Sequence, residues 1–171
     1  ESIIPPIKNI KLNNVSTLKS MADGLRLKEM LNEESNKNVV IIGAGFIGLE
    51  AIEACKNKNK NVTVIQLEDR ILSNVFDEEI TSVLQEEIKK HDVNLLLNES
   101  VTELVGDTKV TKVITNKNKE IYADIVIIAT GVKPNTEFLK YTDLEMMPNG
   151  AIIVDEYGKT NIKDIYAAGD C

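Results

Sequence analysis

Residues 38–50 read Asn-Val-Val-Ile-Ile-Gly-Ala-Gly-Phe-Ile-Gly-Leu-Glu, and this stretch decides the fold. The run Val39–Ile42 is β-branched and apolar on both faces, which is typical of a parallel strand buried between two layers. Gly43, Gly45 and Gly48 follow at once, and a helical pattern begins after them. The order of strand, glycine-rich turn and helix predicts the first unit of an α/β domain.

The three glycines have the spacing G-x-G-x-x-G, in which each glycine has its own physical task. Gly43 permits a tight turn, Gly45 lets the backbone approach a pyrophosphate, and Gly48 lets helix and strand pack closely. Free N–H groups and the positive end of the helix dipole then face the phosphates, so that no basic side chain is required. The stretch predicts a dinucleotide-binding site, against the alternative of a purely structural glycine turn.

Composition excludes several classes of partner. The chain has 171 residues and is 43% apolar, which suffices for one compact core. Its net charge is −7, and no Lys- or Arg-rich stripe is present to bind nucleic acid or an anionic membrane. The longest apolar run, Val39–Leu49, is shorter than the roughly 20 residues that cross a bilayer. No secretory signal is visible and Cys55 and Cys171 share no motif spacing, so we expect a cytoplasmic protein.

The rest of the chain alternates between helical and strand patterns. We expect helices over residues 16–31 and from Asp77, the latter with Ile80, Val83, Leu84 and Ile88 on its apolar face. The expected strands cover residues 62–65, 93–97, 124–129, 152–154 and 165–168, and three short pieces at 101–105, 110–115 and 120–122 predict an antiparallel meander. Together these patterns predict a Rossmann-like three-layer α/β domain: a mainly parallel sheet with helices on both faces, plus an antiparallel β-meander.

The end of the second expected strand departs from the usual dinucleotide-binding pattern. An acid about 20 residues beyond the glycines normally binds the adenosine ribose hydroxyls, but this place holds Gln66. Glutamine can hydrogen-bond a hydroxyl without the strength of a charged acceptor, and Glu68 can substitute if the loop bends inward. The carboxylates of Glu68 and Asp69 would repel the 2′-phosphate of NADP. Arg70 lies somewhat too far along the chain to offset this repulsion. The residues therefore favour NAD over NADP.

Cys55 and His91 are residue types that often take part in catalysis, but we do not expect either to do so here. Cys55 falls on the apolar side of the first glycine-linked helix, where a small buried hydrophobe is expected rather than a reactive thiol. His91 lies at the end of the helix that starts at Asp77 and is expected to be a solvated partner of the helix dipole.

Three stretches together resemble a known family. They are Gly43–Glu50, the Ala-Thr-Gly-Val-Lys-Pro-Asn of residues 129–135, and the Tyr-Ala-Ala-Gly-Asp-Cys of residues 166–171. They resemble the flavin-dependent pyridine nucleotide–disulfide oxidoreductases, in the branch that contains coenzyme A disulfide reductases and NADH oxidases. All three occur in the family's order, and the resemblance covers essentially the whole chain.

The resemblance implies a place for this chain within a longer one. Members of the family have an FAD domain, an NAD(P)H domain inserted within it, and a C-terminal dimerisation domain. Residues 1–36 would connect from the FAD domain, residues 37–132 would be the NAD(H)-binding domain, and residues 133–171 would return toward the FAD domain. The family's first glycine-rich loop, its redox-active cysteine and its dimerisation domain are missing, so we expect an excerpt of a homodimeric parent.

The resemblance also implies roles for single residues. The three glycines would hold the NADH pyrophosphate, Phe46 would cover the flavin ring, and Ile47 would line the nicotinamide pocket. Glu50 resembles a glutamate that pairs with a lysine of the FAD domain. Gly131 would contact the nicotinamide half, and Asp170 would bind FAD in the parent enzyme only. Simple packing for Phe46 and a solvated carboxylate for Glu50 remain open alternatives.

The implied function is hydride transfer from NADH to FAD and on to a disulfide such as coenzyme A disulfide, or to dioxygen. The excerpt alone is expected to bind NAD(H), without holding FAD stably or turning over. It is expected to contain neither catalytic residues nor a metal site. Two alternatives are a stand-alone NADH-sensing module and the NADH domain of a ferredoxin- or nitrite-reductase-type flavoprotein.

Overall fold

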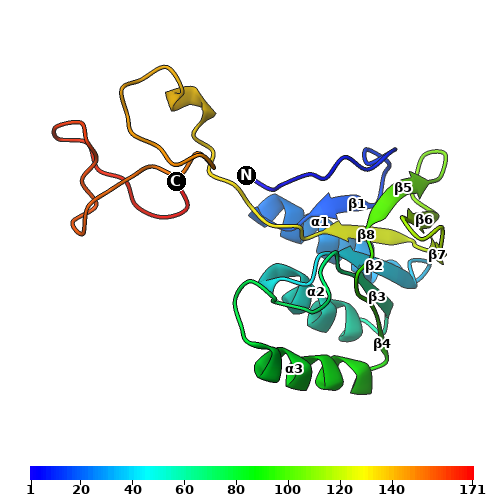
Figure 1. Cartoon of the computed structure of the whole chain (residues 1–171). Coiled ribbons are helices and arrows are strands. Elements are labelled where there is room, and N and C mark those ends of the chain that lie inside the picture. Colours follow the sequence, from blue (N-terminus) through cyan, green and yellow to red (C-terminus); the bar gives the residue numbers. More distant parts are fainter. The chain divides into compact units, whose positions relative to one another are not determined.

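A five-stranded parallel sheet forms the centre of the computed structural model, in the order β1-β8-β2-β3-β4 (Figure 1). The strands are β1 (Val15–Thr17), β2 (Asn38–Ile42), β3 (Asn61–Ile65), β4 (Val93–Leu96) and β8 (Ile125–Ile128). The register sets Ile41 of β2 opposite Val64 of β3 and Ile127 of β8. Because successive side chains point to opposite faces, the apolar runs of β2 and β8 supply two separate cores.

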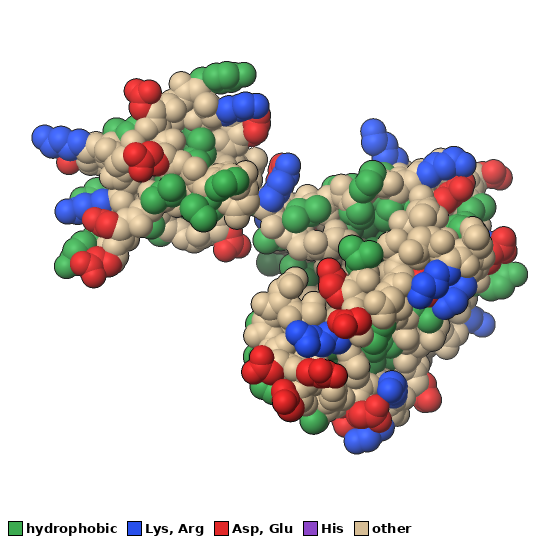
Figure 2. Space-filling model, viewed as in Figure 1, with side chains coloured by type: hydrophobic (Ala, Val, Ile, Leu, Met, Phe, Trp, Pro, Cys, Tyr) green, Lys and Arg blue, Asp and Glu red, His purple; other side chains and the backbone are tan.

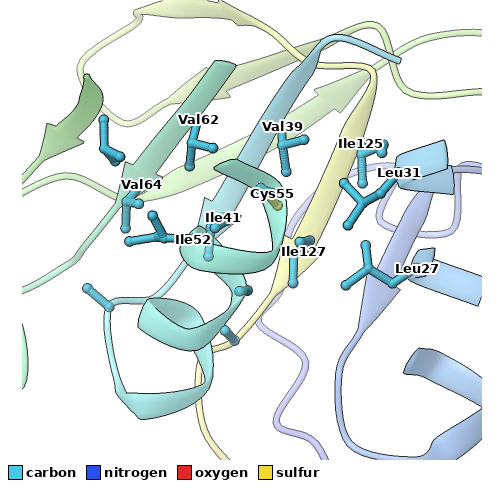
Figure 3. Close-up of a cluster of buried hydrophobic side chains, with 14 of the residues drawn as sticks. Leu27, Leu31, Val39, Ile41, Ile52, Cys55, Val62, Val64, Ile125 and Ile127 are labelled. Atoms are coloured by element: carbon cyan, nitrogen blue, oxygen red, sulfur yellow. The ribbon is translucent and has the colours of Figure 1, made fainter. Parts of the chain in front are cut away.

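Three helices pack against one face of this sheet: α1 (Met21–Asn32), α2 (Phe46–Lys56) and α3 (Glu78–Lys90). Figure 3 shows Leu27 and Leu31 of α1 beside Ile125 and Ile127, and Ile52 and Cys55 of α2 over the neighbouring strands. Alternate residues of β2, β3 and β8 supply the sheet's side of this core. These helices position the turns at the carboxyl ends of the strands.

The opposite face is covered by an antiparallel sheet of β5 (Val101–Val105), β6 (Lys112–Thr115) and β7 (Glu120–Tyr122). Leu104 and Val113 pack with Val40, Val126 and Ile128 in the second core. The predicted three-layer α/β fold with its meander is confirmed. Helices were expected on both faces but cover only one, because the meander occupies the face that a doubly wound domain gives to helices.

The amino edge of the parallel sheet is fastened by one carboxylate. Asp124 Oδ2 accepts hydrogen bonds from the backbone N–H of Lys37 at 2.9 Å and of Asn38 at 2.8 Å, and from Asn38 Nδ2 at 3.1 Å. These bonds join the start of β8 to the start of β2. They fix the two central strands at the edge opposite the glycine-rich turn.

The expected helix over residues 16–31 begins later than predicted. Val15–Thr17 is strand β1, paired in parallel with Val126–Ile128, because β-branched residues here gain a ladder of hydrogen bonds. Ser20 then caps α1 in a capping box with Asp23, whose carboxylate accepts from the backbone N–H of Ser20. The backbone N–H groups of Ser20 and Lys19 lower the pKa of Asp23.

The buried face of α3 also differs from the prediction. Thr81 is buried, and Leu84 and Ile88 pack on the helix-side core, whereas Ile80 and Val83 are 50% and 70% exposed. The expected apolar stripe is therefore rotated around the helix. No helix in the chain combines the length and apolar character needed to cross a membrane.

The structure describes residues 1–171, which form two compact units: Ile4–Gly131, and Glu1–Ile3 with Val132–Cys171. The second unit holds a single 3₁₀ turn, η1 (Glu137–Leu139), and isolated bridges. The expected strands at 152–154 and 165–168 are reduced to the bridges of Ile152 with Met146 and of Tyr166 with Lys159.

Candidate dinucleotide-binding site

Gly43 and Gly48 are required by the protein's own backbone. Gly43 has φ +102°, and a Cβ there would lie 2.4 Å from the carbonyl oxygen of Ala129. A Cβ at Gly48 would lie 2.1 Å from the carbonyl oxygen of Gly43. No side chain fits such distances, so these two glycines allow β2, α2 and the end of β8 to pack together.

Gly45 differs, because a Cβ there would meet no protein atom within 4 Å. It is the N-cap of α2, with φ −80°, and nothing in the protein caps this helix through a side chain. The first helical bond runs from Leu49 N–H to Gly45 C=O at 3.0 Å, while the N–H groups of Phe46 and Ile47 find no acceptor in the protein. An open space, free amides and the positive end of an 11-residue helix suit an anion.

The carboxyl ends of the central strands meet at this turn. Gly43 N–H donates to Ile65 C=O at 2.9 Å, which ties the turn to the end of β3. Ala129 N–H donates to Ile42 C=O at 2.8 Å, and Gly131, with φ +106°, follows two residues later. The structure thus brings the predicted glycine turn, Gln66 and Gly131 to one edge of the sheet, where open α/β sheets bind ligands.

Gln66 is buried at the end of β3, and both ends of its amide are used. Its Oε1 accepts from the N–H of Ala44 at 2.7 Å, inside the glycine-rich turn. Its Nε2 donates to Oε2 of Glu68, whose side chain is exposed. Gln66 therefore joins the turn to a carboxylate, a connection that the sequence does not reveal.

Phe46 and Glu50 project from the first turns of α2. Phe46 is 59% exposed and meets Phe76 edge to face, with ring centroids 6.0 Å apart. Glu50 is exposed and makes no ion pair, and Ile47 is half-buried against the helix-side core. Asp170, the residue predicted to serve FAD in the parent, belongs to the other unit and is exposed there.

Glu99 supports this edge and was missed in the sequence. Its side chain is 1% exposed and accepts from Thr115 Oγ1 at 2.6 Å and from Lys119 Nζ at 2.8 Å, while its N–H donates to Gln66 C=O at 3.0 Å. Burial raises the pKa of Glu99, but donation by Lys119 and Thr115 outweighs it, so the pKa lies below its ordinary value. A glutamate after a short strand carries no signal that distinguishes it from a surface residue.

Arg70 is a second residue whose place could not be read from the sequence. Its Nη2 donates to Ser73 C=O at 3.0 Å, and its buried Nε has no partner. It lines a small hollow between its loop and α3, whose other lining residues are Asp69, Glu78, Thr81, Ser82 and Gln85. Arg70 therefore faces its own loop and α3.

Cys55 is fully buried, as predicted, and burial raises its pKa to about 11, so it is a thiol at neutral pH. His91 is the exposed C-cap of α3, with Nε2 3.3 Å from Glu87 Oε1. The chain holds no group of three His, Cys, Asp or Glu side chains placed to bind a metal ion. Charges of both signs mix on the visible face of residues 4–131, without a continuous basic patch (Figure 2).

A parallel sheet with free helix amides at its carboxyl edge is typical of nucleotide-binding α/β proteins. The chain belongs to the pyridine nucleotide-disulphide oxidoreductase family, which it matches over residues 1–171. It is 41% identical over 167 residues to the NAD(P)H coenzyme A polysulfide/persulfide reductase of Pyrococcus horikoshii, and 43% identical over 170 residues to an NADH oxidase of Enterococcus faecalis.

Each alignment covers 98% of this chain but 37% of the relative, so the chain spans little more than a third of the length of these proteins. Among solved structures, the NAD-dependent persulfide reductase of A. fulgidus superposes with a TM-score of 0.91 at 39% identity, over 98% of this chain and 31% of that one. The predicted family and the partial coverage are both confirmed.

Proposed function

We propose that this chain is the NAD(H)-binding part of a flavoprotein oxidoreductase that passes hydride from NADH to FAD and on to a disulfide of the coenzyme A type, or to dioxygen. The observation that carries the proposal is the pair of free amides at Phe46 and Ile47 beside the open space at Gly45. The names of the similar reductases and oxidase support it.

The chain's own residues would bind and orient the nucleotide. The amides of Phe46 and Ile47 would donate to the pyrophosphate, and the open space at Gly45 lets these oxygens approach the backbone. Gly131, on the same edge, would adjoin the nicotinamide half. When bound, the nicotinamide supplies the hydride, and the protein's contribution is to hold it in one orientation over the acceptor ring.

Phe46 and Glu50 would face the flavin side of the site. Phe46 is exposed and held on one side by Phe76, so its ring can cover an acceptor surface. Glu50 has no partner within the chain and would pair with a cation of the missing FAD domain. Asp170 would contact FAD in the parent, and the chain alone would neither retain FAD nor turn over.

Titration of the purified chain with NADH, followed by nicotinamide fluorescence, tests the binding proposal. We expect a saturable change, and its absence at millimolar NADH would contradict the proposal. The absorbance of the purified protein tests the second part: a flavin spectrum that co-purifies with the chain would show that it retains FAD by itself.

A further inference from the structure

Two side chains just beyond the end of β3, those of Gln66 and Glu68, are hydrogen-bonded to each other. We propose that Glu68 is the group that receives the ribose hydroxyls and rejects a 2′-phosphate, and that Gln66 is a positioning residue that holds Glu68. This inference rests on the proposed NAD(H) site and names the nucleotide that the site selects. It assigns the acid's task to a residue two positions beyond the strand end.

The first step is that Gln66 has little left to offer a ligand. Its Oε1 accepts from Ala44 N–H at 2.7 Å, its Nε2 donates to Glu68, and its side chain is buried. Its backbone is fixed as well, with N–H donating to Leu96 C=O at 2.8 Å and C=O accepting from Glu99 N–H at 3.0 Å. Because its side chain and backbone are held by these hydrogen bonds, Gln66 is placed to orient Glu68.

The second step is that Glu68 lies beside the phosphate turn. One amide group, that of Gln66, separates its carboxylate from the N–H of Ala44, the residue before Gly45. Its backbone C=O accepts from Asn98 N–H at 2.9 Å, so the main chain at Glu68 is held to the loop after β4. The carboxylate is exposed with one oxygen bonded to Gln66, and its remaining acceptor capacity suits vicinal hydroxyls.

The third step is that no cation near Glu68 in the sequence is free to neutralise a 2′-phosphate. Arg70 donates to Ser73 C=O and lines the hollow against α3, together with Asp69 and Glu78. A 2′-phosphate would bring about two negative charges against the Glu68 carboxylate. The site therefore selects NADH over NADPH by repulsion as well as by hydrogen bonding.

The test compares the affinities of NADH and NADPH by calorimetry on the 171-residue chain and its variants. Glu68→Gln keeps the shape and removes the charge of an exposed residue. It should lower the preference for NADH over NADPH by about tenfold, because a charged acceptor and a repulsion are both lost. Asp69→Asn is the matched control, which removes the neighbouring charge and should change the preference by less than about threefold.

Gln66→Met tests the positioning role through its dependence on Glu68. It should lower the NADH preference in the parent chain, but should have no further effect on that preference in the Glu68→Gln background. Additive effects would show that Gln66 binds the ribose directly and would overturn its assignment. An unchanged preference in Glu68→Gln would overturn the inference alone, whereas failure of the parent chain to bind either nucleotide would overturn the proposed function with it.

Discussion

The two units of the chain differ in how far they bury their apolar side chains. Residues 4–131 bury theirs on both faces of the parallel sheet, in two cores. Among residues 132–171, Leu144 is the one apolar side chain that is buried, whereas Phe138, Tyr141, Tyr157 and Tyr166 are at least 60% exposed. Figure 2 shows hydrophobic side chains on the visible face of this smaller unit.

We expect most of the chain's stability to reside in the larger unit. A sheet with two covered faces removes apolar area from water by itself, whereas a unit with its aromatic rings exposed gains little from its own contacts. The chain is also little more than a third as long as its relatives. We expect the larger unit to unfold cooperatively and the smaller one to depend on surfaces supplied by the parent protein.

The largest expected difference is in native-state hydrogen exchange. Amides of β2 and β8, which pair with each other in the sheet centre, should exchange at least about 10³-fold more slowly than their intrinsic rates, because they open only on global unfolding. Amides of residues 151–168 should exchange within about tenfold of those rates. Mass spectrometry of the labelled chain measures both, and equal protection in the two units would break the comparison.

A matched pair of truncations tests the same point through side chains. Ile127→Ala removes a side chain that is 0% exposed in the helix-side core and should lower the free energy of unfolding by about 2–5 kcal/mol. Ile165→Ala truncates a side chain that is 44% exposed in the smaller unit. It should change the free energy of unfolding by less than about 1 kcal/mol. Urea denaturation followed by circular dichroism provides both values. A comparable loss for the two variants would contradict the assignment of the core.

Within the larger unit, substitutions at two glycines distinguish a residue needed for packing, Gly48, from one expected to matter for nucleotide binding, Gly45. Gly48→Ala forces a Cβ onto the Gly43 carbonyl and should cost about 1–3 kcal/mol of stability. Gly45→Ala enters open space at φ −80°, so the loss of a preferred cap residue and the gain from a less flexible unfolded chain should cancel to within about 0.5 kcal/mol. Thermal melts compare the two variants.

Gly45→Ala should nevertheless weaken NADH binding by about tenfold or more, because the new methyl group occupies the approach to the amides. Calorimetric titration of the variant measures this loss. Unchanged NADH affinity in a folded Gly45→Ala chain would show that the pyrophosphate lies elsewhere.

A further difference between the units is a pH dependence of stability carried by Glu99. The pKa of Glu99 in the folded chain lies below the ordinary glutamate value of about 4.3. The ionised carboxylate therefore stabilises the fold above about pH 4.3, and this stabilisation is lost as the pH falls through the pKa of the folded state. Glu99→Gln should therefore be less stable than the parent by about 1–2 kcal/mol at pH 7, with the gap closing below about pH 4.

Asp155 is the control in the smaller unit. Its pKa is also lowered, chiefly by the backbone N–H of Lys159 that donates to it, but it is exposed in a turn. Asp155→Asn should leave the urea midpoint of the larger unit unchanged at every pH. A shift equal to that of Glu99→Gln would mean that the two units unfold together.

The regular elements of the larger unit could be predicted because their patterns are local. The buried run of β2, the glycine spacing and the acids at the start of α3 each act within a few residues, and the predicted strand and the two predicted helix starts are confirmed. The segment Val15–Thr17 is a strand although the sequence predicts a helix from residue 16, because its partner, Val126–Ile128, lies more than 100 residues away. Its pairing outweighs the helical pattern that follows it.

The site was predictable where backbone geometry sets it and unpredictable where side chains meet across the fold. Gly43 and Gly48 are identified by spacing alone. The link from Ala44 through Gln66 to Glu68 depends on one rotamer, and the contacts of Glu99 with Thr115 and Lys119 depend on how the meander covers the sheet. Such contacts join segments that no local pattern relates.

The carboxylate of Asp124 has a consequence for how this domain can change. It secures the beginnings of β2 and β8 with three hydrogen bonds, at the end of the sheet remote from the glycine-rich turn. The alignment of the two strands is thus fixed at the edge of the sheet opposite the proposed nucleotide site. We therefore expect that substitutions in the loop from Gln66 to Arg70 would alter the choice of nucleotide without disturbing the register of the strands.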